Sequence, residues 1–468
     1  MHRHRSEKLH RVQRRRIRTQ VARETGKHNK IIMRVYIETY GCQMNKLDSE
    51  LVLGDFAAAG FDIAGTDEDA DVILVNTCSV RAHAENRAYS RLGRLKHRKK
   101  RSPSLVIGVI GCMAEKDGEE IFRRLPHVDL VAGTRHLDEL AGLVREIADG
   151  KERVLAVGEK PLRFAKRNII PGRPNYKAFV SIMRGCDNYC AYCVVPYVRG
   201  REISRPPAEI VEECRRLADA GTVEITLLGQ NVNSYGKGLE EKITFPELLY
   251  KVDATPGLKR LRFVTSHPKD CSDELLHAMR DLPTVCEHLH LPAQSGSTKI
   301  LEAMNRGYAA EDYRERIAKA RGTVPGIRLM SDFIIGFPGE TEEDAAATES
   351  LVRDAEYQNC FIFSYSPRPG TKAAKMPDDV PPEVKSERHQ RLLALQKEIS
   401  TETHAAIHGE TVEVLVEGRS KRDERRLSGR TRGNEIVVFE SEKDLTGRTV
   451  KVKIVDSTAL TLVGMLEP

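Results

Sequence analysis

Three cysteines stand close together in the middle of the chain, in the stretch CDNYCAYC. Cys186, Cys190 and Cys193 have the spacing C-x3-C-x2-C. Thiolates are soft ligands that hold iron–sulfur clusters, and three of them leave one iron of a four-iron cubane without a protein ligand. Such an iron can chelate an amine and a carboxylate, as a methionine moiety presents them. A zinc knuckle is the alternative, but zinc normally needs a fourth Cys or His nearby, which this stretch lacks.

Three more cysteines are far apart in the sequence, but each follows an apolar run typical of a strand. Cys42 follows RVYIETYG, Cys78 follows DVILVNT and Cys112 follows LVIGVIG. Ligands gather at the carboxyl ends of strands in an open parallel sheet, so these cysteines can meet at one edge. We interpret them as a second cluster site, with separately buried thiols as the alternative. The remaining cysteines lack partners at ligand spacing and are expected to be packing thiols: Cys214, Cys271, Cys286 and Cys360.

The order of the expected strands and helices predicts how these residues are positioned. Apolar runs alternate with helical stretches over residues 33–150, which is typical of a parallel α/β sheet. A linker is expected over 151–171. Six further strand–helix repeats over 172–403 fit an incomplete (β/α)6 barrel. Four short β-branched runs over 404–468 are typical of a small β-barrel, with a basic loop at 418–434. The expected fold class is therefore α/β with a C-terminal β-barrel.

Composition excludes several classes of protein. The 468 residues are 31% charged, contain no Trp and have no long apolar run, so a membrane-spanning helix is not expected. No apolar segment follows the N-terminus as in a secretory signal. Ten cysteines in such a chain indicate metal or redox chemistry rather than a disulfide framework. We therefore expect a cytoplasmic protein.

The positive charge is concentrated at the N-terminus. Residues 1–32 carry eight Arg, three Lys and two Glu, a balance of +9 against +7 for the whole chain. A disordered basic tail is the expected interpretation; an RNA-binding arm and a mitochondrial presequence are the alternatives. Translation could also begin at Met33, directly before the first strand, in which case the tail is dispensable.

Several motifs resemble a known family. CDNYCAYC resembles the cluster loop of radical S-adenosylmethionine (SAM) enzymes. ETYGCQMNKLDSE, VNTCSVRAHAENRA and VIGCMAE resemble the amino-terminal domain of methylthiotransferases, and the terminal β-barrel resembles the RNA-binding TRAM module. The resemblance covers residues 34–468. It implies two 4Fe–4S clusters: one on Cys186, Cys190 and Cys193 that binds SAM, and an auxiliary one on Cys42, Cys78 and Cys112 that carries sulfur. One SAM would methylate that sulfur, and a second would supply a radical.

Contacts to SAM are expected from the cluster loop and from polar strand ends. The resemblance implies that Tyr192 contacts the adenine, with packing inside the loop as the alternative. Polar turns at strand ends give the other candidates: Gln230, Asn231, Ser266 and Gln294. We assign no catalytic residue beyond the cluster ligands. His288 and His290 share one face of a strand and either line the barrel or form a structural pair.

Smaller motifs also carry expectations. Arg199, Arg201 and Arg205 follow the cluster loop, where they either meet phosphates and carboxylates of a ligand or form ion pairs. Thr341 is expected to cap the helix that begins in TEED.

The expected substrate follows from the branch of the family. YGCQMN and HLHLPAQSGSTKILEAMNRGY resemble the branch that modifies C2 of N6-dimethylallyladenosine, immediately 3′ of the anticodon of tRNA. The branches that act on threonylcarbamoyl-adenosine in tRNA or on an aspartate of a ribosomal protein are alternatives. A non-enzymatic iron–sulfur RNA-binding regulator is the alternative from another class. Expected partners are the tRNA anticodon stem-loop, a reducing electron donor and a sulfur donor, and the chain is expected to act as a monomer.

Overall fold

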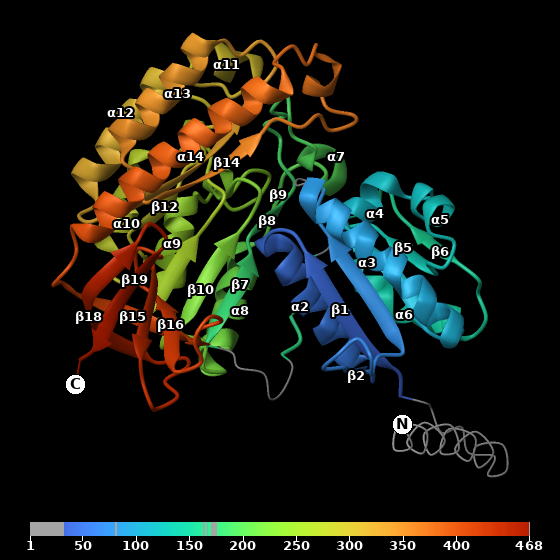
Figure 1. The fold of residues 1–468 in the computed structure, drawn as a ribbon. Helices are drawn as coiled ribbons and strands as arrows, with labels where there is room; N and C mark the ends of the chain where they lie inside the picture. Colours follow the sequence, from blue (N-terminus) through green and yellow to red (C-terminus); the bar gives the residue numbers. More distant parts are fainter. Residues whose placement is uncertain (1–31, 80–81, 162–163, 166, 170–175, 468) are drawn as a thin grey trace, which may run out of the picture.

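The computed structural model describes residues 32–467 except 80–81, 162–163, 166 and 170–175. It contains a parallel sheet, a curved half-barrel and a closed β-barrel, in chain order (Figure 1). This arrangement confirms the predicted fold class. The predicted basic tail, except for Ile32, lies outside the described residues, as does most of the Pro- and Gly-rich end of the predicted linker.

The first unit is a six-stranded parallel sheet in the order β2-β1-β3-β4-β5-β6. Its strands are β1 (Arg34–Tyr40), β2 (Asp62–Ile63), β3 (Val72–Thr77), β4 (Val106–Gly111), β5 (Leu130–Ala132) and β6 (Val154–Ala156). Its helices are α2 (Gln43–Ala58), α3 (Ala82–Arg101), α4 (Cys112–Asp117), α5 (Glu120–Arg124), η1 (Leu137–Glu139) and α6 (Leu140–Ala148). Strand β6 lies in the segment that we expected to be a linker, so the sheet continues past residue 150.

Alternating residues of the central strands build two cores, one on each face of this sheet. Ile73 and Val75 of β3 pack on the side of α3, whereas Val72 and Leu74 pack on the side of α2 and α6. Because side chains alternate along a strand and both faces are covered, β3 and β4 are buried throughout and mostly apolar. This buried centre fixes the strand ends at which the cysteines stand.

The second unit is a half-barrel of six parallel strands. They are β7 (Lys177–Ser181), β10 (Glu224–Leu228), β11 (Arg260–Phe263), β12 (His288–His290), β13 (Arg328–Ile335) and β14 (Asn359–Ser364). A parallel bridge between Leu261 and Val285 joins the two halves, β7-β10-β11 and β12-β13-β14. All six predicted barrel strands are therefore confirmed.

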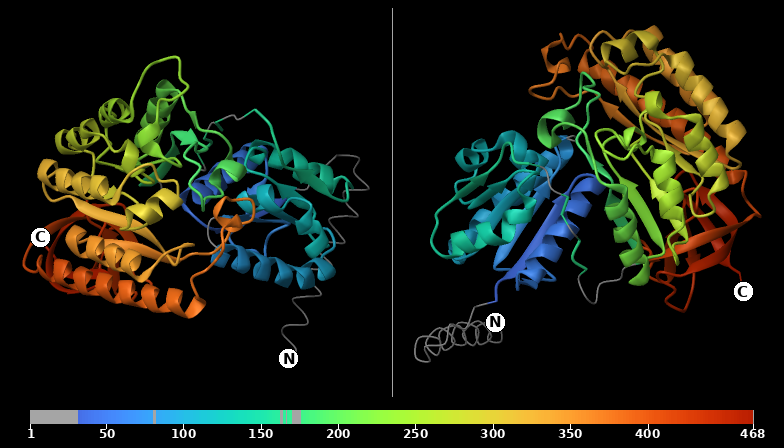
Figure 2. Two further views of the ribbon diagram at one scale, coloured as in Figure 1. Left: turned by 90° about the horizontal axis from the view of Figure 1, so that it is seen from above. Right: turned by 180° about the vertical axis from the view of Figure 1, so that it is seen from behind.

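Helices cover the outside of the half-barrel (Figures 1 and 2). They are α8 (Pro207–Asp219), α9 (Phe245–Asp253), α10 (Asp273–Asp281), α11 (Thr298–Ala303), α12 (Ala310–Thr323), α13 (Glu342–Ala355) and α14 (Pro382–Ala405), with the short turns η2 (Val232–Ser234), η3 (Pro268–Asp270) and η4 (Ala373–Lys375). The cluster-loop segment adds β8 (Met183–Arg184), α7 (Val195–Arg199) and β9 (Ile203–Ser204). Seen from behind, the first sheet stands beside this segment (Figure 2, right).

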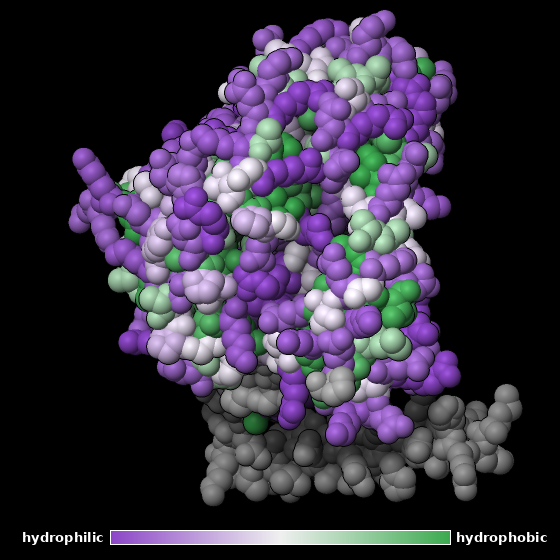
Figure 3. Space-filling view, turned by 90° about the vertical axis from the view of Figure 1, so that its left-hand side faces the viewer, coloured by the Kyte–Doolittle hydropathy of each residue, from purple (hydrophilic) through white to green (hydrophobic). Residues whose placement is uncertain are grey.

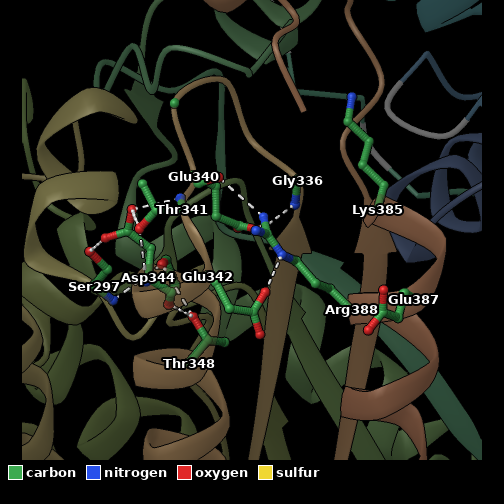
Figure 4. A network of polar contacts seen from close by, with 12 residues as sticks. Ser297, Gly336, Glu340, Thr341, Glu342, Asp344, Thr348, Lys385, Glu387 and Arg388 are labelled. Atoms are coloured by element: carbon green, nitrogen blue, oxygen red, sulfur yellow. Dashed lines mark hydrogen bonds and ion pairs between the residues drawn. The ribbon is translucent and has the colours of Figure 1, made fainter. Parts of the chain in front are cut away.

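A polar network holds the turn after β13 (Figure 4). Glu340 accepts a hydrogen bond from the backbone N–H of Gly336 at 2.9 Å and forms a buried ion pair with Arg388 of α14 at 3.0 Å. Thr341 caps α13, because its hydroxyl accepts from the N–H of Asp344 while Asp344 accepts from the N–H of Thr341. The predicted cap is thus confirmed, and the network ties α13 and α14 to the end of the longest strand of the half-barrel.

The third unit is a closed barrel in the order β15-β16-β17-β19-β18. Its strands are β15 (Thr411–Arg419), β16 (Arg426–Arg430), β17 (Ile436–Glu440), β18 (Thr449–Thr458) and β19 (Thr461–Leu466). The prediction of a basic loop over 418–434 is wrong in part, because β16 lies inside it. That strand reads RLSGR, whose Arg and Gly residues hide its alternation; only Leu427 and Gly429 face inward.

Arginines fasten this barrel to the amino ends of the half-barrel strands. Arg260, at the start of β11, forms an ion pair with Glu413 at 2.8 Å and donates to the carbonyl of Arg430 at 2.8 Å. Arg328, at the start of β13, pairs with Glu435 at 2.7 Å. The barrel therefore docks at the edge opposite to the strand ends that carry the cluster loop.

The face that displays this barrel is mostly hydrophilic, with small separate hydrophobic patches (Figure 3). Among the described residues, no helix combines the length and apolarity that crossing a bilayer requires.

Candidate active site

Cys42, Cys78 and Cys112 lie at the carboxyl ends of three adjacent strands. In the sheet register Tyr40 pairs with Thr77, and Thr77 pairs with Gly111. Cys78 and Cys112 are therefore the next residues on neighbouring strands, and Cys42 stands two residues beyond Tyr40 as the N-cap of α2. The backbone N–H of Cys78 donates to the carbonyl of Tyr40 at 2.9 Å. The sheet thus brings together three residues separated by 36 and 34 positions in the sequence.

Buried amides hold the first of these strand ends in place. Asn45 donates to Asn76 at 3.0 Å, Asn76 donates to Ser49 at 2.9 Å, and all three side chains are buried. The thiol of Cys42 lies 3.2 Å from Oδ1 of Asn45. Because buried amides with satisfied hydrogen bonds are costly to rearrange, this network fixes the side of α2 that presents Cys42.

A glycine is required next to Cys42. Gly41 has φ +146°, and a Cβ added there would lie 2.5 Å from Cβ of Cys78 and 2.8 Å from Oδ1 of Asn45. The first chain segment can therefore approach Cys78 only because position 41 has no side chain.

The second set, Cys186, Cys190 and Cys193, lies on a loop after β7 and β8. Gln230, at the end of β10, accepts from the N–H of Gly185 at 2.6 Å, and the N–H of Ala191 donates to the carbonyl of Met304 at 2.8 Å. Gly185 has φ +79°, and a Cβ there would lie 1.9 Å from the carbonyl oxygen of Arg201. The loop is thus held by the end of β10 and by the end of α11, and the predicted Gln230 contributes by accepting from the backbone of the loop.

The two sets of cysteines face each other across α7. Val194, directly after Cys193, and Val198 of α7 pack against Cys112 in one buried cluster. On the opposite side, Leu228 at the end of β10 packs against Met44 and Leu47 of α2, the helix that begins after Cys42. Short, apolar contacts therefore connect the first sheet to the mouth of the half-barrel.

The environments of the cysteines differ in their effect on the thiols. A hydrogen bond from Cys78 and the charge of Arg199 outweigh burial and lower the pKa of Cys42 to about 6. Burial raises the pKa of Cys112. It also raises the pKa of Cys186 to about 11 and that of Cys193 to about 12. A bound metal stabilises thiolates. A cluster would therefore lower the pKa most for the buried thiols, whose pKa burial has raised.

Among the described residues, no three His, Cys, Asp or Glu side chains converge as they would around a single metal ion. In a four-iron cubane each thiolate binds a different iron, so its ligands stand farther apart than those of one ion. Soft sulfur donors, a set of three in each case, fit an iron–sulfur cluster better than a tetrahedral zinc site.

Unpartnered polar atoms gather at the ends of β10 and β11. Buried atoms without an acceptor or donor in the described residues include Oδ1 of Asn231, both amide atoms of Asn233, Oγ of Ser266 and Nε2 of His267. Asn231 does donate to Asp270 at 2.6 Å. Buried polar atoms are normally paired, so this group fits a polar ligand such as SAM. Burial lowers the pKa of His267 to about 2, which keeps its ring neutral.

Tyr192 and Gln294 also lie near this region, in different ways. The hydroxyl of Tyr192 accepts from Arg306 at 3.3 Å, and its ring packs on a cluster that includes Phe337 and Tyr365. Gln294 has φ +73° and pairs through its backbone with β13. A left-handed conformation is uncommon for a residue with a side chain, so position 294 is held by its surroundings.

Arg306 was missed by sequence reasoning. Its buried guanidinium lies 3.4 Å from the sulfur of Cys190 and donates to the carbonyl of Pro292 at 2.8 Å. The motif MNRGY gives no spacing signal that would connect it to the cluster loop, 116 residues earlier.

The remaining predicted residues are accounted for by internal contacts. The three arginines after the cluster loop all form ion pairs: Arg199 with Asp48, Arg201 with Asp187, and Arg205 with Glu213. His288 contacts Met330, and His290 lies 3.0 Å from Asp332. The four predicted packing thiols are all buried.

Comparisons with known proteins agree with this geometry. Residues 34–133 match the family model described as "Uncharacterized protein family UPF0004", 180–352 match the radical SAM superfamily, and 406–466 match the TRAM domain. The chain is 48% identical over 92% of its length, and 92% of the relative's, to a tRNA-2-methylthio-N(6)-dimethylallyladenosine synthase of Thermoanaerobacter sp. (strain X514). A synthase of the same name from Carboxydothermus hydrogenoformans is 47% identical over 92% of this chain and 98% of its own.

Among solved structures, the radical SAM methyltransferase TsrM from Kitasatospora setae shares the fold. It has a TM-score of 0.52 at 15% sequence identity, covering 71% of this chain and 73% of TsrM. With close to half of its residues identical to these synthases over nearly their whole length, the chain belongs to the radical SAM methylthiotransferase family.

Proposed function

We propose that this protein attaches a methylthio group to C2 of N6-dimethylallyladenosine in tRNA, at the position immediately 3′ of the anticodon. The observation that carries the proposal is the facing pair of cysteine sets, in a chain 48% identical to synthases whose name states this product. An aromatic C–H is neither acidic nor easily displaced. Its replacement by sulfur therefore calls for a radical source and a sulfur source next to each other.

Each set of cysteines would hold one 4Fe–4S cluster. Cys186, Cys190 and Cys193 would hold the cluster that binds SAM, and Cys42, Cys78 and Cys112 the auxiliary cluster. When bound, the clusters and two molecules of SAM supply the substrate radical, the sulfur and the methyl group. The packing of Val198 on Cys112 supports a short path between the two sites.

Residues of the half-barrel would bind and orient SAM. Asn231 and Ser266 offer buried polar atoms that have no partner within the described part of the chain, and Tyr192 presents an aromatic surface beside Arg306. Gln294 would shape the floor of the site through its backbone, because its conformation is held by β13. Nδ1 of neutral His267 accepts from the backbone N–H of Lys269, so its Nε2–H would donate one hydrogen bond to the ligand without adding charge.

Exposed basic residues support tRNA as the partner. Lys421 and Arg422, between β15 and β16, are exposed and have no carboxylate partner among the described residues. On α3, Arg94, Lys96 and Lys100 are likewise exposed. Such side chains neutralise phosphates without reading bases. We further propose that the chain works as a monomer in the cytoplasm, with a separate electron donor and sulfur donor.

The nucleosides of cells that lack this protein test the proposal. We expect the 2-methylthio derivative of N6-dimethylallyladenosine to disappear from tRNA, with the unmodified precursor accumulating. The parent gene should restore it and a Cys42→Ala gene should not. Retention of the methylthio nucleoside would contradict the proposal. Loss of a threonylcarbamoyl derivative, or of the modification on the ribosomal protein, would select another branch of the family, and no change in either would favour the regulator.

A further inference from the structure

Helix α7 connects the two sets of cysteines. It begins at Val195, two residues after Cys193, and its Val198 packs on Cys112 of the first sheet. Thr134, which follows β5, donates from its hydroxyl to the carbonyl of Val198 at 2.8 Å. A movement of α7 would therefore change both sites together.

One buried carboxylate receives two arginines that flank the cluster loop. Asp48 lies on α2, six residues after Cys42, and is fully buried. Arg199, the last residue of α7, donates to Oδ2 of Asp48 at 2.8 Å. Arg184, two residues before Cys186, donates to Oδ1 of Asp48 at 3.2 Å. Both guanidiniums are buried, so the two ends of the loop are fastened to the helix that presents Cys42.

This arrangement leaves an excess of positive charge in a buried place. Two guanidiniums share one carboxylate, and Nη1 of Arg199 and Nε of Arg184 have no acceptor among the described residues. A buried charge without a partner costs several kcal/mol, so an anionic group is expected nearby. Arg199 directly follows Val198, which packs on Cys112. The unpaired Nη1 of Arg199 therefore belongs to a guanidinium close to the auxiliary cysteines.

We propose that Arg199 is a positioning residue for the auxiliary cluster, which it both orients through α7 and stabilises by donating to its sulfur atoms. Asp48 holds the guanidinium in place and balances part of its charge. This inference rests on the proposed function only in assuming that Cys42, Cys78 and Cys112 hold a cluster. Hydrogen bonds to sulfur and nearby positive charge raise the reduction potential of iron–sulfur clusters. Arg199 is thus expected to make the auxiliary cluster easier to reduce.

The reduction potential of the auxiliary cluster tests this role. The full chain with Cys186, Cys190 and Cys193 replaced by Ala should hold only that cluster, whose potential can be followed by electron paramagnetic resonance during a redox titration. We expect Arg199→Gln to shift the potential to a more negative value. Arg199→Lys, which keeps the charge, should restore most of it. Arg201→Gln is the matched control, because Arg201 is exposed and pairs with Asp187 instead.

The outcomes separate this role from a structural one. An unchanged potential in Arg199→Gln with full iron content would overturn the proposal. If Arg199→Gln loses its iron, Asp48→Asn provides the test. Removing the carboxylate leaves the positive charge of Arg199 less balanced, so the reduction potential should become more positive. An unchanged or more negative potential would overturn the proposal. The protein with Cys186, Cys190 and Cys193 replaced by Ala could also hold no iron at all while its Arg201→Gln variant remains folded. That result would contradict the auxiliary cluster of the proposed function itself, and not only the role of Arg199.

Discussion

Thr134 donates a hydrogen bond to the backbone carbonyl of Val198 over 2.8 Å, although 64 residues separate them in the sequence. Thr134 stands at the carboxyl edge of the first sheet, and Val198 lies on the helix that follows the cluster loop. The bond is buried, so it is not weakened by water. It shows that the edges that carry the two sets of cysteines face one another instead of opening on separate surfaces.

Each set of cysteines should bind its own share of the iron and should be needed for a different step of the reaction. Replacing Cys186, Cys190 and Cys193 with Ala should remove about half of the iron and abolish cleavage of SAM. Replacing Cys42, Cys78 and Cys112 should also remove about half, but leave SAM cleavage intact while sulfur insertion stops. Iron analysis and release of 5′-deoxyadenosine measure both. Loss of SAM cleavage in a folded variant of the second kind would refute this division.

Gly41→Ala should disable the auxiliary site alone. The added methyl group would stand 2.5 Å from Cβ of Cys78, so Cys42 and Cys78 could not keep their relative position. We expect iron content to fall toward that of the variant that lacks Cys42, Cys78 and Cys112, with SAM cleavage retained. Gly60→Ala is the matched control: its φ is also positive, at +84°, but nothing lies within 4 Å of the new atom. Equal iron loss in both variants would indicate a general loss of stability.

Basic side chains on the C-terminal barrel should increase the affinity for tRNA by neutralising its phosphates. Changing Lys421 and Arg422 to Ala should weaken binding and reduce the slope of log K against log salt by roughly one for each phosphate that the variant no longer neutralises. Fluorescence anisotropy at several salt concentrations measures both. Arg123→Ala is the control, because that exposed residue pairs with Glu120 at 3.0 Å. A weakened affinity with an unchanged slope would argue against binding of phosphates by these two side chains.

Asp344 should stabilise the protein in a pH-dependent way. Burial raises the pKa of its carboxyl, but hydrogen bonds from Lys299, Ser297 and Thr341 outweigh it and bring the pKa to about 2. The unfolded value is about 3.9. A lowered pKa means that the charged form favours folding, so the contribution is complete above the unfolded value and is lost as pH falls through the folded one.

We therefore expect Asp344→Asn to lower the free energy of unfolding by on the order of 1–3 kcal/mol at neutral pH, with the difference shrinking between about pH 4 and pH 2. Denaturant titrations at several pH values measure it. Glu315→Gln, an exposed position on α12, should have little effect at any pH. A difference between Asp344→Asn and the parent that stayed constant down to pH 2 would be inconsistent with the lowered pKa.

The local pattern of the sequence was enough to place the strands that carry the cysteines. The runs before Cys78 and Cys112 are mostly apolar because both faces of β3 and β4 are covered, and such runs are recognisable without any partner. Strand β16 escaped prediction for the opposite reason, since its Arg residues face outward and its inward positions include a glycine. Strand β6 has three residues and a half-exposed centre, too little for a periodic pattern.

Contacts between segments that are distant in the chain could not be predicted from the sequence. Nothing in the spacing of Asp48, Arg184 and Arg199 indicates that they meet, because the contact depends on how the first sheet docks on the half-barrel. The register that aligns Cys78 with Cys112 is likewise a property of the sheet. Arg199 was expected either to meet a ligand or to form an ion pair; Asp48 accounts for one of its nitrogens, and Nη1 is left unpaired among the residues that the structure describes.

The central claim is that one chain both cleaves SAM and inserts a methylthio group into tRNA. The most direct measurement incubates anaerobically reconstituted protein with SAM, a reductant and tRNA carrying N6-dimethylallyladenosine, and then analyses the nucleosides by mass spectrometry. The account predicts the 2-methylthio nucleoside, and none from protein that lacks Cys42, Cys78 and Cys112. Protein that contains both clusters and releases 5′-deoxyadenosine, yet leaves the nucleoside unchanged, would contradict it.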